Sequence, residues 1–166
     1  MSERLYYFVI VGRDDRVLYD LLYPASLSEL DWRTSSELSS PAERGDFEPH
    51  HFIPSIQVLP QFVAYSALDH IEEKYWLTSA RSLKHIFRFR DWSASVQLTP
   101  NAATRFVLVH GASDDASRNA RAFLHAVYEA YVPHVVCNPF QEEDAPITSK
   151  RFHEVAKNLA KRYFSG

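Results

Sequence analysis

Two segments of this chain are apolar on both alternating faces, and they constrain the fold more than any other feature. Residues 5–11 read LYYFVIV and residues 106–109 read FVLV. Side chains alternate between the two faces of a strand, so a strand with no polar face must be covered on both sides. We therefore predict a sheet with helices packed against each of its faces.

Three further segments have the length and composition of strands. Residues 17–23 follow a polar turn at 12–16 and form a hairpin with the first strand. Residues 83–90 alternate weakly, and a turn at Pro100-Asn101 leads into residues 106–109. Between them, apolar Ala94, Val96 and Leu98 alternate with polar Ser93, Ser95 and Gln97. That alternation predicts a strand with one buried face, and the tight turns predict mainly antiparallel pairing.

Three segments have the 3.6-residue periodicity of helices that pack on a sheet. The first begins near Pro60, and its apolar stripe consists of Ala64, Ala67, Leu68, Ile71 and Tyr75. The second begins at Ser113 or Asp114 and should kink or end at Pro133, with a stripe of Phe123, Leu124, Val127, Tyr128 and Tyr131. The third begins at Thr148 or Ser149, with Phe152, Val155, Ala156, Leu159 and Tyr163 on one side.

These elements predict one α+β domain spanning residues 1–166. Its sheet has five antiparallel strands, with the helix at 60–75 on one face and the two later helices on the other. Residues 24–57 interrupt the pattern, because they contain four prolines, seven serines and six acids but only two basic residues. So long a connection without periodicity is uncommon in a compact domain. We expect a mobile insertion at about 26–50.

The composition excludes several functional classes. The net charge of −3 gives no reason to expect nucleic acid as a partner, and no apolar run approaches the ~20 residues of a membrane span. A single cysteine, Cys137, allows no internal disulfide and fits a reducing compartment. We expect a soluble protein of the cytoplasm.

The sequence offers little for catalysis. It contains no GxGxxG, P-loop, GxSxG or HExxH motif. The adjacent pair His50-His51 lacks a cysteine or a well-spaced acid that would complete a metal site. Cys137 has His134 nearby, but it follows two valines and is predicted to pack in the core as a small hydrophobe. We therefore expect no enzymatic activity, no metal and no cofactor.

The first helix carries an unusual set of residues opposite its apolar stripe. Phe62, Asp69 and Trp76 recur at intervals of seven, and Asp69 lies ~140° from the centre of the stripe. Large apolar side chains that point away from a core often mark a surface for another protein. The alternative is that Phe62 and Trp76 lie near the helix ends and fold back onto loops. Both interpretations stay open on the residues alone.

Several segments together resemble a known family. They are FVIVG at 8–12, ALD at 67–69, WL at 76–77, LKHIFRFRDW at 83–92, RFVLVH at 105–110 and NPF at 138–140. The chain resembles sedlin, the subunit 2 family of the transport protein particle (TRAPP) complex, which has a longin-like (SNARE-like) fold. The resemblance spans nearly the whole chain except residues 26–50, where the family has a shorter loop. A sister family, the subunit 2-like proteins, shares NPF and the first strand.

The resemblance implies a non-catalytic adaptor in a vesicle tether that acts as nucleotide exchange factor for a Rab GTPase. It implies other TRAPP subunits as partners, with endoplasmic reticulum-to-Golgi transport as the setting and peripheral membrane association through the complex. The position of Asp69 is implicated in the contact with the large subunits. Other classes stay open: a longin-domain SNARE or a clathrin-adaptor small subunit would have a related fold in a different assembly.

Overall fold

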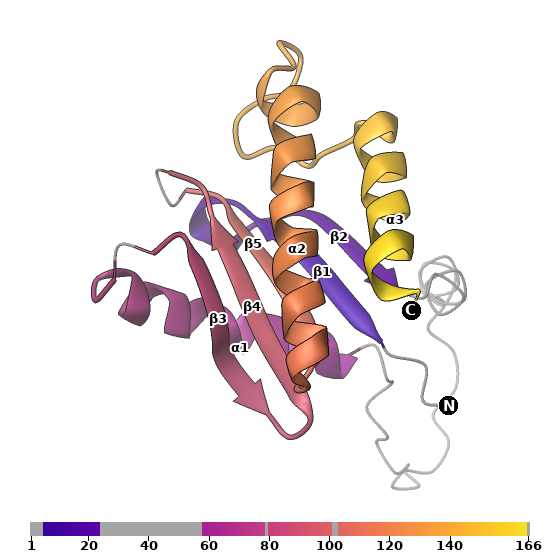
Figure 1. Cartoon of the computed structure of the whole chain (residues 1–166). Coiled ribbons are helices and arrows are strands. Elements are labelled where there is room, and N and C mark those ends of the chain that lie inside the picture. The colour runs from indigo at the N-terminus through magenta and orange to yellow at the C-terminus, as the bar shows by residue number, and fades with distance from the viewer. Residues whose placement is uncertain (1–4, 24–57, 79, 101–102, 166) are drawn as a thin grey trace, which may run out of the picture.

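The computed structural model describes residues 5–23, 58–78, 80–100 and 103–165 (Figure 1). The expected insertion at 26–50 and Asn101 lie outside the described residues. Within them, five strands and three α-helices follow the predicted order. The strands are β1 (Tyr6–Val11), β2 (Val17–Tyr23), β3 (Ser82–Phe89), β4 (Trp92–Leu98) and β5 (Arg105–Gly111). The helices are α1 (Val58–Tyr75), α2 (Asp114–Tyr131) and α3 (Lys150–Phe164), with a 3₁₀ turn η1 (Arg13–Asp15) and a π-helical turn η3 (Val132–Val136).

The strands form one five-stranded antiparallel sheet in the order β2-β1-β5-β4-β3. The two doubly apolar segments are β1 and β5, which pair at the centre of the sheet with Tyr7 opposite Val109. All six residues of β1 are buried, and so are the first six residues of β5. The α+β, five-stranded antiparallel architecture is therefore confirmed.

Alternation along the strands divides the interior into two hydrophobic layers. Phe8 and Ile10 of β1 pack with the buried residues of α2 and α3, whereas Val9 and Val11 pack with those of α1. In Figure 1, α2 and α3 lie in front of the sheet and α1 lies behind it. The outward side of α1 thus belongs to a different surface of the molecule from α2 and α3.

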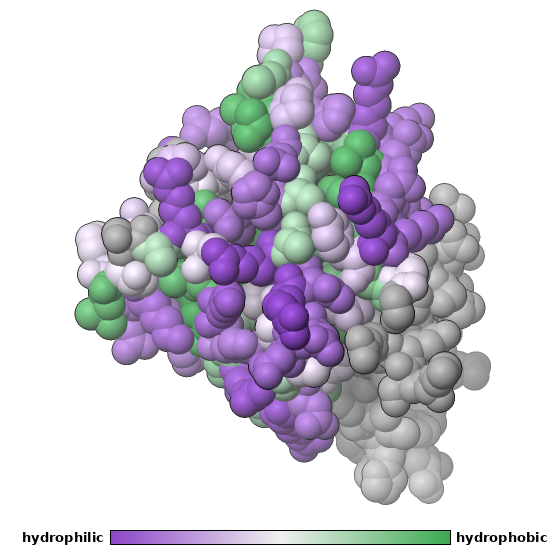
Figure 2. Space-filling view, viewed as in Figure 1, coloured by the Kyte–Doolittle hydropathy of each residue, from purple (hydrophilic) through white to green (hydrophobic). Residues whose placement is uncertain are grey.

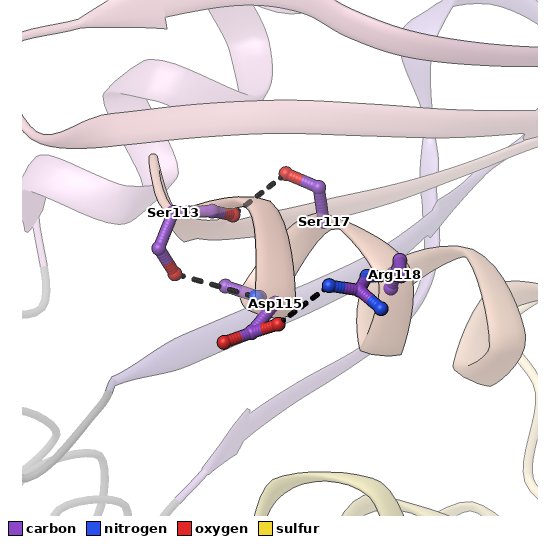
Figure 3. A network of polar contacts seen from close by, with 5 residues as sticks. Ser113, Asp115, Ser117 and Arg118 are labelled. Atoms are coloured by element: carbon purple, nitrogen blue, oxygen red, sulfur yellow. Dashed lines mark hydrogen bonds and ion pairs between the residues drawn. The ribbon is translucent and has the colours of Figure 1, made fainter.

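The N-terminus of α2 is capped as the sequence indicates (Figure 3). The Ser113 hydroxyl accepts a hydrogen bond from the Ala116 amide at 3.3 Å, and the Ser117 hydroxyl donates to the Ser113 carbonyl at 2.9 Å. Arg118 and Asp115 form an exposed ion pair at 2.9 Å. Such caps satisfy groups that the first helical turn leaves without partners. At the other end, α2 stops at Tyr131 and Pro133 lies within η3.

The prediction that β4 has one buried face is wrong. Ser93 and Ser95 are about as buried as Ala94 between them, because α2 also packs against this side of the sheet. Ser95 and His110 lie 2.8 Å apart, and His110 also contacts the Gly111 carbonyl at 2.7 Å. Since a carbonyl only accepts, His110 Nδ1 donates to it and the neutral ring accepts from Ser95 through Nε2. Polar residues in a strand can thus be buried when they pair with each other.

Cys137 is exposed, so its predicted burial in the core is also wrong. Of the residues in η3, Val135 is the buried one, while Val136 remains 62% exposed. Cys137 follows Val136 on the exposed side of the π-helical turn and caps that turn. A run of apolar residues around a cysteine therefore did not indicate its burial.

Two helical stripes differ in detail from those predicted. Tyr75 is 40% exposed, because the C-terminal end of α1 extends past the edge strand β3 in Figure 1. Val63, missing from the predicted stripe, is fully buried instead. The centre of the α3 stripe consists of Phe152, Ala156, Ala160 and Phe164. The predicted members Val155, Leu159 and Tyr163 flank it and are half-buried.

Candidate protein-interaction surface

The outward side of α1 presents aromatic side chains at both ends and acids between them. Phe62 is 52% exposed and Trp76, which directly follows the helix, is 83% exposed. Asp69 is exposed between them, as its place on the helical wheel indicates. Glu72 and Glu73 are exposed on the same side. We call these residues, together with Tyr65, the α1 face.

The alternative interpretation, in which the aromatic residues fold back, holds in part for Phe62. Its ring meets the ring of Phe89 on β3 edge-on, with 5.7 Å between centroids. About half of the side chain still faces solvent. Trp76 packs edge-on against Tyr75 at 5.9 Å and is otherwise open. Phe62 therefore packs partly against the edge strand β3, whereas Trp76 projects into solvent.

Asp69 makes no stabilising polar contact within the described part of the chain. No described group forms a hydrogen bond or an ion pair with its carboxylate. An aspartate in the middle of a helix has poor intrinsic propensity and caps nothing there. A carboxylate of this kind is available to accept charge-assisted hydrogen bonds from an arginine or lysine of another molecule. The site roles of Phe62, Asp69 and Trp76 stay predictions.

Contacts with β3 hold α1 in a fixed orientation on the sheet. The His70 ring packs on Phe87 at 5.1 Å, and its Nδ1 lies 3.0 Å from the Ser66 carbonyl one turn earlier. Lys74 Nζ donates to the Ile86 carbonyl at 3.4 Å. Together with the buried residues on the inner side of the helix, these contacts fix which side chains face outward. The α1 face is thus a preformed surface on a rigid element, which reduces the entropic cost of binding.

Sequence reasoning missed part of this surface. Tyr65 is 46% exposed and lies one turn after Phe62, so the i, i+3 spacing was the available signal. Leu77 is 82% exposed beside Trp76. A shallow depression of about 500 Å³ is lined by Trp76 and Leu77 together with Arg81 and Pro100. The exposed apolar surface on this side of α1 is therefore broader than Phe62 and Trp76 alone.

Chemistry-bearing groups are not gathered into a catalytic arrangement in the part of the chain that the structure describes. No group of three or more His, Cys, Asp or Glu residues there could hold a metal ion. Burial lowers the pKa of His110, with a further contribution from the nearby His85, and burial raises the pKa of Tyr7. Both belong to packed layers of the sheet rather than to a cleft. No helix among the described residues is both long and apolar enough to span a bilayer.

Comparison with known proteins identifies the family. The sedlin family matches residues 10–162 of the chain. A probable trafficking protein particle complex subunit 2 from Drosophila melanogaster is 29% identical over 95% of this chain and 96% of its own length. A protein of the same description from Caenorhabditis elegans is 26% identical over 99% and 100%. The transport protein particle 20 kDa subunit of Schizosaccharomyces pombe is 26% identical over 95% and 97%. The chain therefore belongs to the sedlin family.

Proposed function

We propose that this protein is a non-catalytic subunit of the TRAPP tethering complex, and that its α1 face binds one of the large subunits of that complex. The relatives that it matches along nearly their whole length are named as subunits of this particle. In this role it joins the small-subunit core to the large subunits of an assembly that promotes nucleotide exchange on a Rab GTPase. It works in the cytoplasm, peripheral to the membranes of the endoplasmic reticulum and the Golgi.

One observation carries the assignment of the surface. The exposed Asp69 carboxylate, which has no partner among the described residues, lies between Phe62 on α1 and Trp76 directly after it, and both aromatic residues are exposed. Binding energy at interfaces concentrates in a few aromatic and charged residues surrounded by weaker contacts. Phe62 and Trp76 supply the apolar contact area, and the charge of Asp69 fixes the position of the partner on that area. A partner surface with an arginine or lysine between two apolar hollows would complement this arrangement.

A co-purification experiment tests the assembly. When a tagged copy is expressed in cells of the organism that encodes it and is purified, the small and the large TRAPP subunits should co-purify in stoichiometric amounts. Recovery of clathrin-adaptor subunits, or of no partner, would contradict the assignment. Turnover of a substrate by the isolated chain would contradict the non-catalytic role.

Substitution of Trp76 tests whether the α1 face is the binding surface. Trp76→Ala should weaken binding of a large subunit by about 2 kcal/mol or more if Trp76 is an anchor. Phe140→Ala is the matched control, because Phe140 is 93% exposed outside the α1 face. Equal recovery of the large subunit by both variants would place the contact elsewhere on the molecule.

A further inference from the structure

A cavity of about 630 Å³ lies on the other side of the sheet from α1. It opens between the C-terminal end of α2, the turn η3 and residues 141–147. Its apolar lining includes Leu18 of β2, Tyr131 of α2, Val132 and Val136 of η3, and Ile147. The volume falls within the ~300–1,000 Å³ of typical ligand pockets. We call this the η3 cavity.

Apolar side chains remain open to solvent at the η3 cavity. Val136 is 62% exposed and Val132 is 37% exposed. Figure 2 shows hydrophobic side chains gathered over the C-terminal end of α2, above a face that is otherwise predominantly hydrophilic. A concave apolar patch within a polar surface is a feature of interaction sites rather than of a surface that faces only water.

The charged side chains that line the η3 cavity are all acidic. Glu142, Glu143 and Asp144 line it, and no lysine, arginine or histidine is among the described lining residues. Arg13 of η1 pairs with Glu143 at 3.0 Å, and its backbone amide donates to Asp144 at 3.1 Å. The Glu142 carboxylate has no ion-pair partner among the described residues. This rim repels phosphates and carboxylates and attracts a cationic group.

The acidic wall is held in place before any ligand binds. The Ile147 amide donates to the Leu18 carbonyl at 2.8 Å, and the Gln141 side chain donates to the Ala145 carbonyl at 3.2 Å. Asp144 approaches Gly12 so closely that a Cβ on Gly12 would lie 2.5 Å from its Oδ1. A larger residue at this position would displace the Asp144 carboxylate. The wall of the cavity is thus tied to the β1–β2 connection.

We propose that the η3 cavity binds an extended segment of a partner protein that carries a large apolar side chain next to a lysine or arginine. The apolar side chain enters between Tyr131 and Val136, and the cation pairs with Glu142 at the rim. The charge of the rim excludes anionic ligands such as nucleotides, phospholipid headgroups and fatty acids. The open mouth suits a peptide that continues on both sides. The η3 cavity lies on the other side of the sheet from the α1 face, and Pro100 lines both the cavity and the depression beside Trp76.

The test uses the isolated full-length chain and therefore does not depend on the proposed TRAPP role. A random-peptide phage library is selected on the immobilised protein, and the enriched peptides are synthesised with a fluorescent label for anisotropy titration. We expect enrichment of an apolar residue within a few positions of Lys or Arg. No enrichment, or enrichment without a basic residue, would overturn the proposal.

Variants then locate the bound peptide. Val136→Glu should weaken its binding about tenfold or more, and Glu142→Lys about three- to tenfold, as expected for an apolar anchor site and a rim charge. Both positions are exposed, so the fold should survive, and circular dichroism checks this. A peptide with its cation changed to Glu should regain affinity for Glu142→Lys. Phe62→Ala is the control and should leave binding unchanged. Binding that Val136→Glu does not weaken, or that Phe62→Ala abolishes, would overturn the proposal.

Discussion

Truncation of Phe106 to alanine should be among the most destabilising substitutions in this protein. Phe106 is the second residue of β5, the central strand of the sheet, and is fully buried in the layer between the sheet and α2. Its ring meets Tyr131 at 5.1 Å, Tyr128 at 5.8 Å and Phe8 at 6.3 Å. Phe106→Ala removes the ring from the point where these three aromatic residues converge.

The expected loss follows from the burial and these contacts. Replacing a buried phenylalanine by alanine costs about 3–5 kcal/mol, as the sum of lost transfer energy and the cavity that remains. Aromatic pairs add about 0.5–1.5 kcal/mol beyond their buried area. With these three pairs, we expect Phe106→Ala to cost about 4 kcal/mol, near the middle of that range. Because domains have about 5–15 kcal/mol in total, the variant should fold but be marginal.

Urea denaturation followed by circular dichroism measures this loss directly. The midpoint should fall while the m-value stays constant, and the melting temperature should drop by roughly 8–16 °C for a chain of this length. Phe140→Ala is the control, because Phe140 is 93% exposed and should change stability by less than about 0.5 kcal/mol. A loss below about 1.5 kcal/mol for Phe106→Ala would refute the two-layer packing.

Three further predictions concern other features. Burial lowers the pKa of His110 in the folded protein. As the pH falls, His110 therefore takes up a proton in the unfolded chain, near the ordinary histidine pKa of about 6.5, before it does so in the folded chain. Unfolding free energy measured from pH 7.5 to 5.5 should therefore decrease with acidification, and less steeply in His110→Gln; equal slopes would contradict this. Cys137 should react with a thiol reagent in the native protein nearly as fast as in urea, and Cys137→Ser should cost less than about 0.5 kcal/mol; strong protection would show a closed site. Gly12→Ala should cost about 0.5–1.5 kcal/mol, because the Asp144 carboxylate must move and lose its hydrogen bond from the Arg13 amide. Urea denaturation measures this loss, and an unchanged midpoint would contradict it.

The central part of the fold could be predicted from local sequence patterns. In β1 and β5, apolar residues on both faces left no arrangement other than a covered sheet, and the cap at Ser113 marked the start of α2. Exposure of Asp69 followed from helical periodicity alone. These features depend on neighbours in sequence, so a sequence pattern contains them.

The features that sequence analysis missed depend on contacts between distant residues. Ser95 is buried because His110, fifteen positions away, provides its partner on the next strand. Cys137 is exposed because of the geometry of η3, which no periodicity reports. The η3 cavity joins Leu18, the end of α2 and residues 141–147. Such groupings arise only from the tertiary fold.

The most direct test of the central claim is quantitative reconstitution of the complex with Asp69→Tyr. This variant removes the exposed charge and adds bulk between Phe62 and Trp76, while Glu129→Tyr makes the same change on the exposed side of α2. We expect that Asp69→Tyr has a normal circular dichroism spectrum, retains the small core subunits and loses a large subunit. Glu129→Tyr should retain all of them. Full recovery of the large subunits by folded Asp69→Tyr would contradict the proposed contact, and an unfolded variant would show that Asp69 supports the fold instead.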